Sequence, residues 1–207
     1  MPEKINFEAL NNLSYGVYVL CAREGYKDNG CIVNTAMLVS ETPYRMLVSV
    51  NKNNYTHDMI KATGKLNVSV LNDNTSLEMI KRFGFVSGRD VDKLDGFDGW
   101  ERADNDIIYV TENANACISG KVYQEVDAGT HTVFFCDITE SIKIDASASL
   151  TYSEYHKNVK PKHSKAVTEK KKYVCTICGY EYEGEELPED FICPWCKHGA
   201  DAFELVK

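Results

Sequence analysis

The sequence predicts a mainly β protein, in which an antiparallel barrel with short helices is followed by a small metal-binding module. Over most of the chain, short segments rich in β-branched and aromatic residues alternate with turns of Gly, Asn and Asp. This pattern is typical of antiparallel barrels. Residues 173–207 then contain two Cys-x-x-Cys pairs, a pattern typical of a tetrahedral metal site.

The predicted strands are short and follow one another closely. They occupy residues 15–23, 31–39, 45–51, 65–71, 106–110, 116–126 and 130–144. The sequence Lys-Asp-Asn-Gly at residues 27–30 predicts the turn between the first two strands, because Asn, Asp and Gly favour turn conformations.

Two short helices are predicted between the strands. The first has Asn54 or Thr56 as its N-cap and ends at Gly64, and the second runs from a Ser76 cap to Gly84. The sequence contains neither a G-x-G-x-x-G fingerprint nor a Walker A motif. A Rossmann dinucleotide-binding domain and a P-loop are therefore both unsupported.

Composition and charge divide the chain into one large domain and one small one. With 207 residues, of which 43% are hydrophobic, the chain can bury one full core and still supply a small second module. Residues 155–172 carry seven Lys against one Glu, which is typical of a solvated tether. The expected divisions are a barrel at 1–156, a basic flexible linker at 157–172 and a metal module at 173–207.

Charge and hydropathy also limit the partners and the location of the protein. The chain has no run of 18 apolar residues and no secretory signal, so we expect a cytoplasmic protein with no membrane partner. The module carries eight acidic residues against two Lys, a balance of −6 that repels nucleic acid and attracts a basic protein. Four single cysteines in apolar segments are expected to be buried and reduced. They are Cys21, Cys31, Cys117 and Cys136.

The four paired cysteines give the strongest chemical signal. Cys175, Cys178, Cys193 and Cys196 supply four soft anionic sulfurs, which select zinc or iron over metals that prefer oxygen. A module of about 35 residues is too small to fold on hydrophobic burial alone, so it needs the metal. Spacing alone favours a structural zinc ribbon.

The residues around these cysteines resemble rubredoxin. The stretches Y-V-C-x-x-C-G-Y and L-P-E-D-F-x-C-P-W-C carry the resemblance, and the short loop between them is similar to the rubredoxin module of rubrerythrins. The resemblance implies one iron ion held by four cysteines, a one-electron carrier. It also implies an aromatic core of Tyr173, Tyr180, Phe191, Trp195 and Phe203. Gly179 fits the turn after the second cysteine, whereas Lys197 stands after the fourth, where glycine is more usual.

The larger domain resembles the FMN-binding split barrel of the flavin reductase and flavin-dependent ferric reductase family. The matching stretches, in order, are VNTAMLVSETP, VSVNKNNYTHDMIKATGKLNVSVL, RFGFVSGRDVDKLDG, GTHTVFFCDI and LTYSEYH, and the resemblance covers about residues 7–156. Joined to the C-terminal module, the chain is similar to flavin reductase–rubredoxin fusions called high-molecular-weight rubredoxins. These pass electrons toward flavodiiron proteins that reduce O2 or NO.

The candidate cofactor site combines residue chemistry with this resemblance. Asn51, Lys52 and Thr56 precede or begin a helix whose first N–H groups are free, which suits a phosphate; capping of the helix is the other interpretation of Thr56. The resemblance adds residues along the isoalloxazine edge and further phosphate-side cations. The expected cofactor-binding residues are Asn34, Thr35, Ala36, Val50, Asn51, Lys52, Thr56, His57, Arg89 and Lys93.

The resemblance also assigns residues near the ring of the flavin. His131 in the GTH stretch is expected to orient the nicotinamide of the substrate rather than to transfer a proton. Tyr152, Tyr155 and His156 are expected to cover the open face of the flavin. The family further implies a homodimer with each FMN near the subunit interface.

Three functions follow from these expectations. The first is an electron-transfer protein that passes electrons from FMN to an iron site and on to a partner such as a flavodiiron O2/NO reductase, with NAD(P)H or an NADH-dependent reductase as donor. The second is an NAD(P)H-dependent flavin or ferric reductase with an accessory module. The third is an FMN-binding protein with a structural zinc ribbon. We favour the first, because a tethered carrier meets its donor at high effective concentration.

Overall fold

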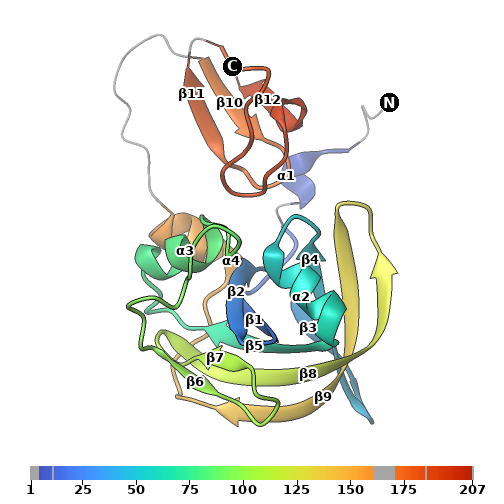
Figure 1. The fold of residues 1–207 in the computed structure, drawn as a ribbon. Coiled ribbons are helices and arrows are strands. Elements are labelled where there is room, and N and C mark those ends of the chain that lie inside the picture. The colour runs from blue at the N-terminus through green and yellow to red at the C-terminus, as the bar shows by residue number, and fades with distance from the viewer. Residues whose placement is uncertain (1–4, 11, 161–170, 185, 207) are drawn as a thin grey trace.

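The structure is a computed structural model, and it describes every residue except 1–4, 11, 161–170, 185 and 207. A β-rich barrel carries a small three-stranded module at one end (Figure 1). No helix of the described segments is long and apolar enough to cross a lipid bilayer.

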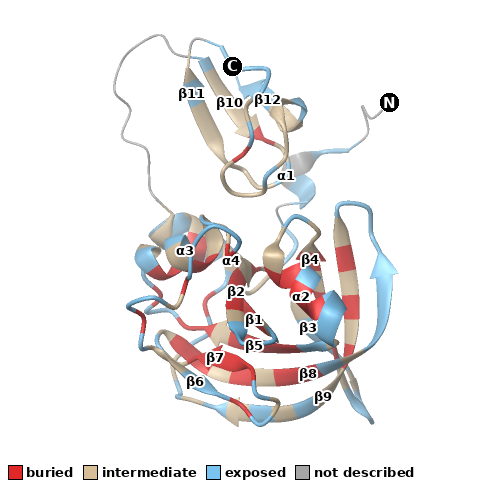
Figure 2. Cartoon of the chain, viewed as in Figure 1, coloured by how far each residue is buried: buried red, intermediate tan, exposed pale blue. Residues whose placement is uncertain are grey.

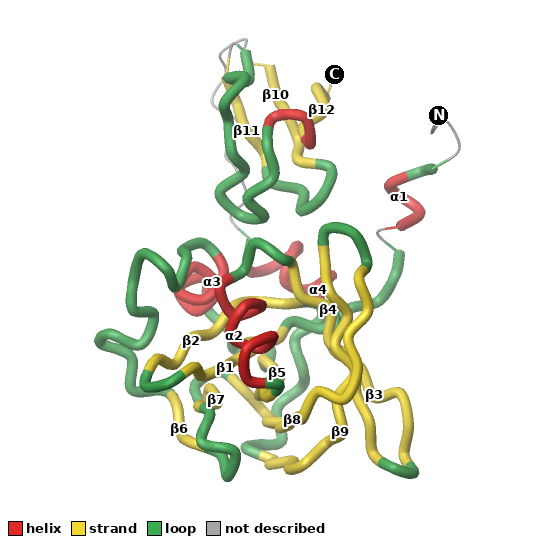
Figure 3. The backbone as a smooth tube through the Cα atoms, turned by 45° about the vertical axis from the view of Figure 1, so that its right-hand side comes forward, coloured by secondary structure: helices red, strands yellow, loops and turns green. Residues whose placement is uncertain are grey.

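The barrel is built on one antiparallel sheet with the strand order β2-β1-β5-β8-β9-β4-β3. Its strands are β1 (Tyr18–Glu24), β2 (Lys27–Val33), β3 (Ala36–Glu41), β4 (Tyr44–Asn51), β5 (Lys65–Leu71), β8 (Ala114–Asp127) and β9 (His131–Lys143). The long pair β8 and β9 curves around the domain (Figure 3). The predicted fold class is therefore confirmed.

The turn predicted at residues 27–30 is wrong. These residues belong to β2, where Lys27 pairs with Glu24 and Gly30 pairs with Cys21. The chain instead reverses at Gly25, whose φ of 59° lies in the left-handed region that glycine enters without strain. Gly30 is small for a packing reason, because a Cβ atom there would lie 3.0 Å from the ring of Phe83.

The two predicted helices are confirmed together with their ends. Helix α2 (Tyr55–Thr63) has Asn54 at its N-cap and Gly64 in the left-handed conformation at its C-cap. In α3 (Leu77–Gly84), the Ser76 side chain accepts a hydrogen bond from the Met79 N–H. The remaining elements of this domain are α1 (Phe7–Leu10), the hairpin of β6 (Trp100–Arg102) and β7 (Ile108–Val110), α4 (Tyr152–Glu154) and the π-helical turn η1 (Tyr155–Val159).

Buried residues follow the inner strands and the inward sides of the helices (Figure 2). One apolar cluster joins β1 to α3 through Val19, Ile80 and Phe83. A second joins β4 to α2 and β9 through Val48, Met59 and Phe134 and related residues. Helices α2 and α3 are thus fixed to the sheet by their apolar faces, which holds the loops at their ends in place.

The small module has three antiparallel strands in the order β11-β10-β12. They are β10 (Lys171–Cys175), β11 (Glu181–Gly184) and β12 (Phe203–Val206), with a 3-10 turn η2 (Ala200–Ala202) before β12. The aromatic core expected for the module is present, since Tyr180 contacts Phe191, Trp195 and Phe203 at ring-centroid distances of 5.3–6.3 Å. The linker was predicted at residues 157–172, but η1 continues to Val159 and β10 begins at Lys171. Regular structure therefore extends into both ends of the predicted linker.

The module contacts the barrel near α3 and η1. The ring of Trp195 stacks on that of Phe85 with a centroid distance of 5.1 Å. The Lys160 Nζ lies 4.6 Å from the centre of the Trp195 ring and donates a hydrogen bond to the Gly179 carbonyl at 3.2 Å. These contacts bring the cysteine-bearing end of the module against the barrel.

Candidate functional site

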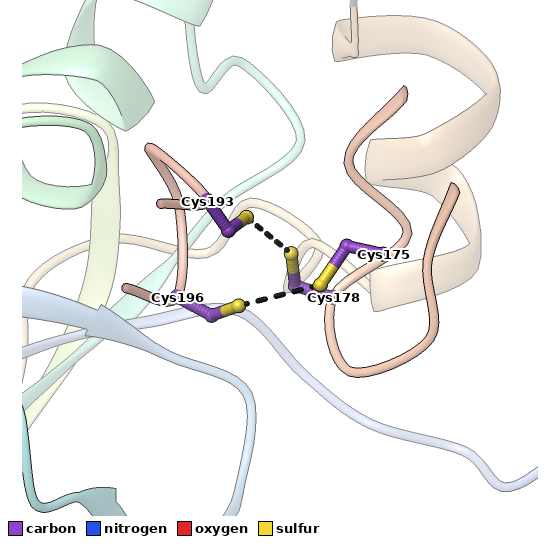
Figure 4. Close-up of side chains that lie close together, drawn as sticks. All are labelled: Cys175, Cys178, Cys193 and Cys196. Atoms are coloured by element: carbon purple, nitrogen blue, oxygen red, sulfur yellow. Dashed lines mark hydrogen bonds between the residues drawn. The ribbon is translucent and has the colours of Figure 1, made fainter. Parts of the chain in front are cut away.

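The four paired cysteines meet at one point. The sulfur atoms of Cys175, Cys178, Cys193 and Cys196 all lie within 4.8 Å of one another, and they point toward a common centre (Figure 4). The pairs Cys175–Cys196 and Cys178–Cys193 are 3.5 and 3.4 Å apart, and none of these cysteines is in a disulfide. Four metal–sulfur bonds of about 2.3 Å in a tetrahedron place the sulfurs about 3.8 Å apart, so the set fits one tetrahedral metal ion.

Two matching backbone turns, here called the cysteine knuckles, present these sulfurs. In the first, the Gly179 N–H donates to the Cys175 carbonyl at 2.8 Å, and in the second the Lys197 N–H donates to the Cys193 carbonyl at 2.9 Å. Backbone N–H groups of Cys196 and Trp195 donate hydrogen bonds to the Cys193 sulfur, and those of Tyr180 and His198 donate to the sulfurs of Cys178 and Cys196. Such donors favour the thiolate form that a metal requires.

A cavity of about 1320 Å³, including the open solvent at its mouth, lies between the barrel and the module. Its walls come from β2, β4, α2, α3, the loop after α3, α4 and η1, and the cysteine knuckles close one side with Cys178 and Cys196. Aromatic side chains make up much of the lining. They are Tyr55, Phe83, Phe85, Tyr152, Tyr155 and Trp195. We call this cavity the flavin pocket.

The polar lining of the flavin pocket is rich in hydrogen-bonding groups and contains no carboxylate among the described residues. Its amide side chains are those of Asn29, Asn34, Asn51, Asn53 and Asn54. Its two lysines are Lys93 from the barrel and Lys197 from the module. A planar aromatic ligand with an anionic group fits this combination of aromatic walls, amides and cations.

Lys93 is a buried cation at the base of the pocket. Its Nζ donates hydrogen bonds to the Gly30 and Phe83 carbonyls at 2.8 and 2.9 Å, and its side chain is 5% exposed. Burial lowers the pKa of Lys93. The two carbonyls occupy two of the three ammonium hydrogens, so the third is available to a ligand.

The N-terminus of α2 also reaches the pocket. Asn54 forms no side-chain cap and instead donates from Nδ2 to the Cys31 sulfur at 3.6 Å. The Thr56 hydroxyl accepts a hydrogen bond from Asn29 Nδ2 at 2.8 Å. The first backbone N–H groups of a helix have no partner within the helix and carry a partial positive charge. This end of α2 is therefore suited to an anion.

The predicted site residues separate into two groups. Seven line the flavin pocket, although they lie far apart in the sequence. They are Asn34, Asn51, Thr56, Lys93, His131, Tyr152 and Tyr155. His131 begins β9, and its Nδ1 lies 2.8 Å from the Thr130 hydroxyl. Their individual roles toward a cofactor stay predictions.

The other predicted residues do not line this pocket. Val50 is fully buried in the apolar cluster of β4, α2 and β9, and Ala36 lines a separate apolar hollow on the barrel. The Thr35 hydroxyl donates to Asn34 Oδ1, and the His156 ring packs against Tyr152. These four residues are not part of the lining described for this cavity, and their expected contacts with a cofactor stay predictions.

The remaining three have polar partners of their own. Lys52 forms an ion pair with Asp127 at 2.7 Å. The His57 ring is held between Asp58 and Thr132 at 3.0 and 2.9 Å. Arg89 pairs with Asp58, and its guanidinium lies over the ring of Tyr55. Lys52 and Arg89 keep further N–H donors beside these ion pairs, and a phosphate contact from either stays a prediction.

Several pocket residues were not predicted from the sequence. Asn29 lies in the stretch interpreted as a turn, and its position in β2 is what directs it toward Thr56. Phe85 and Trp195 line the pocket together, but only the tertiary arrangement brings them into contact. Lys197 carried a local signal, namely a lysine where rubredoxins usually have glycine.

The four single cysteines are buried, as expected, and none forms a disulfide. Burial raises the pKa of Cys21, Cys31, Cys117 and Cys136. Their thiols therefore stay protonated and behave as small apolar groups.

Comparisons with known proteins agree with this geometry. The flavin reductase like domain matches residues 10–159, and the rubrerythrin, rubredoxin-like domain matches residues 173–204. The high molecular weight rubredoxin of Moorella thermoacetica is 33% identical, with 96% of this chain and 99% of the relative covered. The ferric-chelate reductase (NAD(P)H) of Archaeoglobus fulgidus is 34% identical, with 79% of this chain and 96% of the relative covered.

A solved structure supports the fold of the larger domain. The NADH:FAD oxidoreductase SgcE6 of Streptomyces globisporus superimposes with a TM-score of 0.64 at 22% identity, covering 70% of this chain and 85% of that one. The barrel is thus a flavin-binding fold, and the four cysteines form a rubredoxin-like metal site. The chain belongs to the flavin reductase-like family and joins to that domain a rubredoxin-like module, as in the high molecular weight rubredoxin that it resembles along nearly its whole length.

Proposed function

We propose that this protein is an electron carrier that takes electrons at a bound FMN, passes them to an iron ion held by Cys175, Cys178, Cys193 and Cys196, and delivers them to a separate redox partner. FMN supplies an exchange between two-electron and one-electron chemistry, and the iron site supplies a one-electron step. The donor is NAD(P)H or an NADH-dependent reductase. The acceptor is a flavodiiron protein or a similar redox protein.

One observation carries this proposal: two metal-ligand residues, Cys178 and Cys196, line the same cavity as Asn51 and His131. A structural zinc ribbon used only for docking has no need to face the flavin pocket with its sulfurs. A carrier does, because electron transfer requires the two centres to approach closely. The Phe85–Trp195 stack holds the module in this position.

The chemistry of the pocket supports FMN as the flavin. The N-terminus of α2 and the ammonium of Lys93 provide donors for a terminal phosphate. Asn34 and Asn51 provide amides that can hydrogen-bond to the ring edge. Tyr152 and Tyr155 line the same pocket as Cys178 of the module, so their rings are available to cover an open face of the flavin.

The surroundings of the sulfurs support iron as the metal. Backbone N–H groups of Tyr180 and His198 hydrogen-bond to Cys178 and Cys196, and hydrogen bonds to the sulfurs help set the reduction potential of an iron–sulfur site. The aromatic core around Tyr180 shields one side of the site from water.

A role for His131 in orienting the nicotinamide is supported by its position. It lines the pocket beside Asn51, its partner in the β4–β9 ladder. Burial lowers the pKa of His131, with smaller contributions from His198 and His57. A neutral imidazole at pH 7 suits hydrogen bonding to an amide and is unsuited to proton donation.

A homodimer is supported by an apolar surface on the barrel. Edge strand β3 exposes Met37, Leu38 and Val39 by 44–56%. These side chains adjoin the separate apolar hollow that Ala36 and Leu38 line. An exposed apolar edge strand of this kind is covered in stable proteins, and a second copy of the chain provides symmetric cover.

The test is an anaerobic rapid-mixing experiment on the purified protein. After mixing with NADH, the flavin absorbance should bleach first and the iron–thiolate absorbance second, at a rate independent of protein concentration. The flavin is released and identified by mass, and the metal is measured by elemental analysis. Colourless protein with one zinc, or iron that bleaches only in proportion to added partner, would refute the proposal.

A second function is favoured by the ferric-chelate reductase relative, which matches nearly its whole length to the barrel. In that case NAD(P)H reduces the flavin and electrons leave from the barrel directly to a ferric chelate. Removing the metal ligands by Cys178→Ser distinguishes the two functions. Reduction of an external acceptor persists for a ferric reductase and stops for the carrier.

A further inference from the structure

The two cysteine knuckles have the same backbone but differ at one residue. Gly179 follows Cys178 and Lys197 follows Cys196, and each N–H donates to the carbonyl of the first cysteine of its pair. Gly179 has a φ of 73° and Lys197 a φ of 62°. Both are left-handed, a conformation that glycine adopts freely and that a side chain with a Cβ atom disfavours. Lysine at this position is therefore unfavourable for the backbone.

Nothing within the module accounts for this lysine. Lys197 is exposed, and among the described residues its ammonium has no ion pair and no hydrogen bond to a side chain. Its backbone hydrogen bond is one that glycine would make equally well. Its charge therefore has no partner within the described part of the module.

Lys197 lines the flavin pocket from the module, together with Cys178, Trp195 and Cys196. It brings a second positive charge to a cavity that already contains Lys93, and the described lining has no carboxylate to balance either charge. Burial is the main cause of the lowered pKa of Lys93, and the nearby charge of Lys197 adds a smaller repulsion. An anion between them would relieve this repulsion.

We propose that Lys197 is a ligand-binding residue that the rubredoxin-like module contributes to the barrel, where it contacts the negative charge of the bound flavin. This inference rests on the proposed function, since it requires a flavin in the pocket. The negative charge has two sources, the phosphate of FMN and the ring of the reduced flavin. Either contact makes flavin binding and docking of the module favour each other.

The test uses the full-length chain and four variants. Lys197→Gln removes the charge and keeps a long side chain, and Lys197→Gly removes the charge and the backbone strain. Lys197→Arg keeps the charge. Lys171→Gln removes an exposed lysine at the start of β10 and serves as the matched control. Metal content and the melting temperature of each variant report whether the module is folded.

The first readout is flavin affinity, measured by quenching of flavin fluorescence in protein freed of its cofactor. If Lys197 contacts the phosphate, Lys197→Gln and Lys197→Gly bind FMN about three- to fivefold more weakly, the effect expected of one partly exposed charge pair. Riboflavin, which lacks the phosphate, binds all variants equally. Lys197→Arg and Lys171→Gln keep the wild-type affinity.

The second readout is the two-electron midpoint potential of the flavin. If Lys197 contacts the reduced ring, all variants bind oxidised FMN and riboflavin as the wild type does. The midpoint potential then falls by about 14 to 21 mV in Lys197→Gln and Lys197→Gly, which corresponds to a three- to fivefold weaker affinity for the reduced flavin. The melting temperature distinguishes flavin binding by Lys197 from a structural role in the module. Lys197→Gly should keep or raise the melting temperature, because glycine adopts the left-handed conformation without strain.

Three results would overturn the proposal. One is wild-type affinity for both flavins together with a wild-type potential in Lys197→Gln. Another is an equal loss in Lys171→Gln, which would indicate a general effect of net charge. The third is failure of Lys197→Arg to retain binding while its metal content stays complete. A failure of the proposed function differs from all three, because protein that binds no flavin in any variant would show it directly.

Discussion

The stacked pair Phe85–Trp195 should control how fast electrons pass within the chain. Its ring centroids are 5.1 Å apart with an interplanar angle of 21°. It is an aromatic contact between the barrel and the module. Aromatic pairs contribute about 0.5–1.5 kcal/mol beyond the area that they bury. Phe85→Leu keeps an apolar side chain of similar reach and removes the ring.

Loss of this pair should lower the docking equilibrium constant of the module by about two- to twelvefold, since 1.4 kcal/mol corresponds to a factor of ten. The rate of iron reduction after flavin reduction should fall by a factor in this range, up to the limit set by how completely the wild-type module is docked. Anaerobic stopped-flow absorbance after mixing with NADH measures this rate as the bleaching of the iron that follows bleaching of the flavin.

Tyr26→Leu provides the control, because Tyr26 is 99% exposed on the β1–β2 hairpin and its loss should leave the rate unchanged. Trp195→Phe keeps a ring against Phe85 and should lose less than Phe85→Leu. If Phe85→Leu, with full flavin and metal content, reduced its iron at the wild-type rate, the docked arrangement would not be the one that transfers electrons.

The other predictions concern the metal, the assembly and pH. Cys178→Ser should abolish the iron–thiolate absorbance and leave flavin bound, because the module folds on its metal and the barrel has its own core; loss of both would contradict separate folding. Leu38→Glu should give a monomer by light scattering, since it charges the exposed edge strand, whereas Tyr26→Glu should stay dimeric. Burial is the chief reason that the pKa of His131 is lowered in the folded protein. The neutral form of His131 therefore contributes to stability above about pH 6.5, the ordinary pKa of histidine, and this contribution is lost as the pH falls through the pKa of the folded state. His131→Gln should therefore flatten the fall in melting temperature below about pH 6.5, and an unchanged acid limb would contradict this.

Local signals explain what could be predicted from the sequence. Helix ends depend on single residues such as Ser76 and Gly64, and the structure uses both as caps. The metal site depends on spacing within two short stretches, and its four sulfurs converge as expected. The turn at residues 27–30 failed because pairing of β2 with β1 outweighed the local turn preference of Asp-Asn-Gly.

The flavin pocket could be predicted only in part, because it forms by tertiary contact. Residues that match the family motif and face inward, such as Asn51 and His131, line it. Strand alternation turns Val50 away from the pocket and into the core. The sequence did not show which basic side chains form ion pairs with carboxylates. Lys52 pairs with Asp127 and Arg89 pairs with Asp58, and the fold determines the position of both carboxylates.

The contacts between module and barrel are suited to repeated docking and release. The Phe85–Trp195 stack, the Lys160 ammonium over the Trp195 ring and the hydrogen bond from Lys160 to the Gly179 carbonyl each contribute about 1 kcal/mol. With the flexible linker that the sequence predicts at 157–172, the effective concentration of the module would lie in the millimolar range, and contacts of this size would hold it at the pocket without fixing it there.

The module must be able to leave the barrel because its metal-bearing face is the one that contacts the barrel. Cys178 and Cys196 lie at the flavin pocket, while Ile177 beside them is 47% exposed. In the carrier proposed above, an external acceptor would approach the metal by the face that the barrel covers in the docked state. The two must therefore exclude each other, and an acceptor at high concentration should slow internal reduction by competing for this face. A much tighter interface would speed the first transfer and block the second, so an affinity of a few kcal/mol between barrel and module is what a carrier with two successive partners requires.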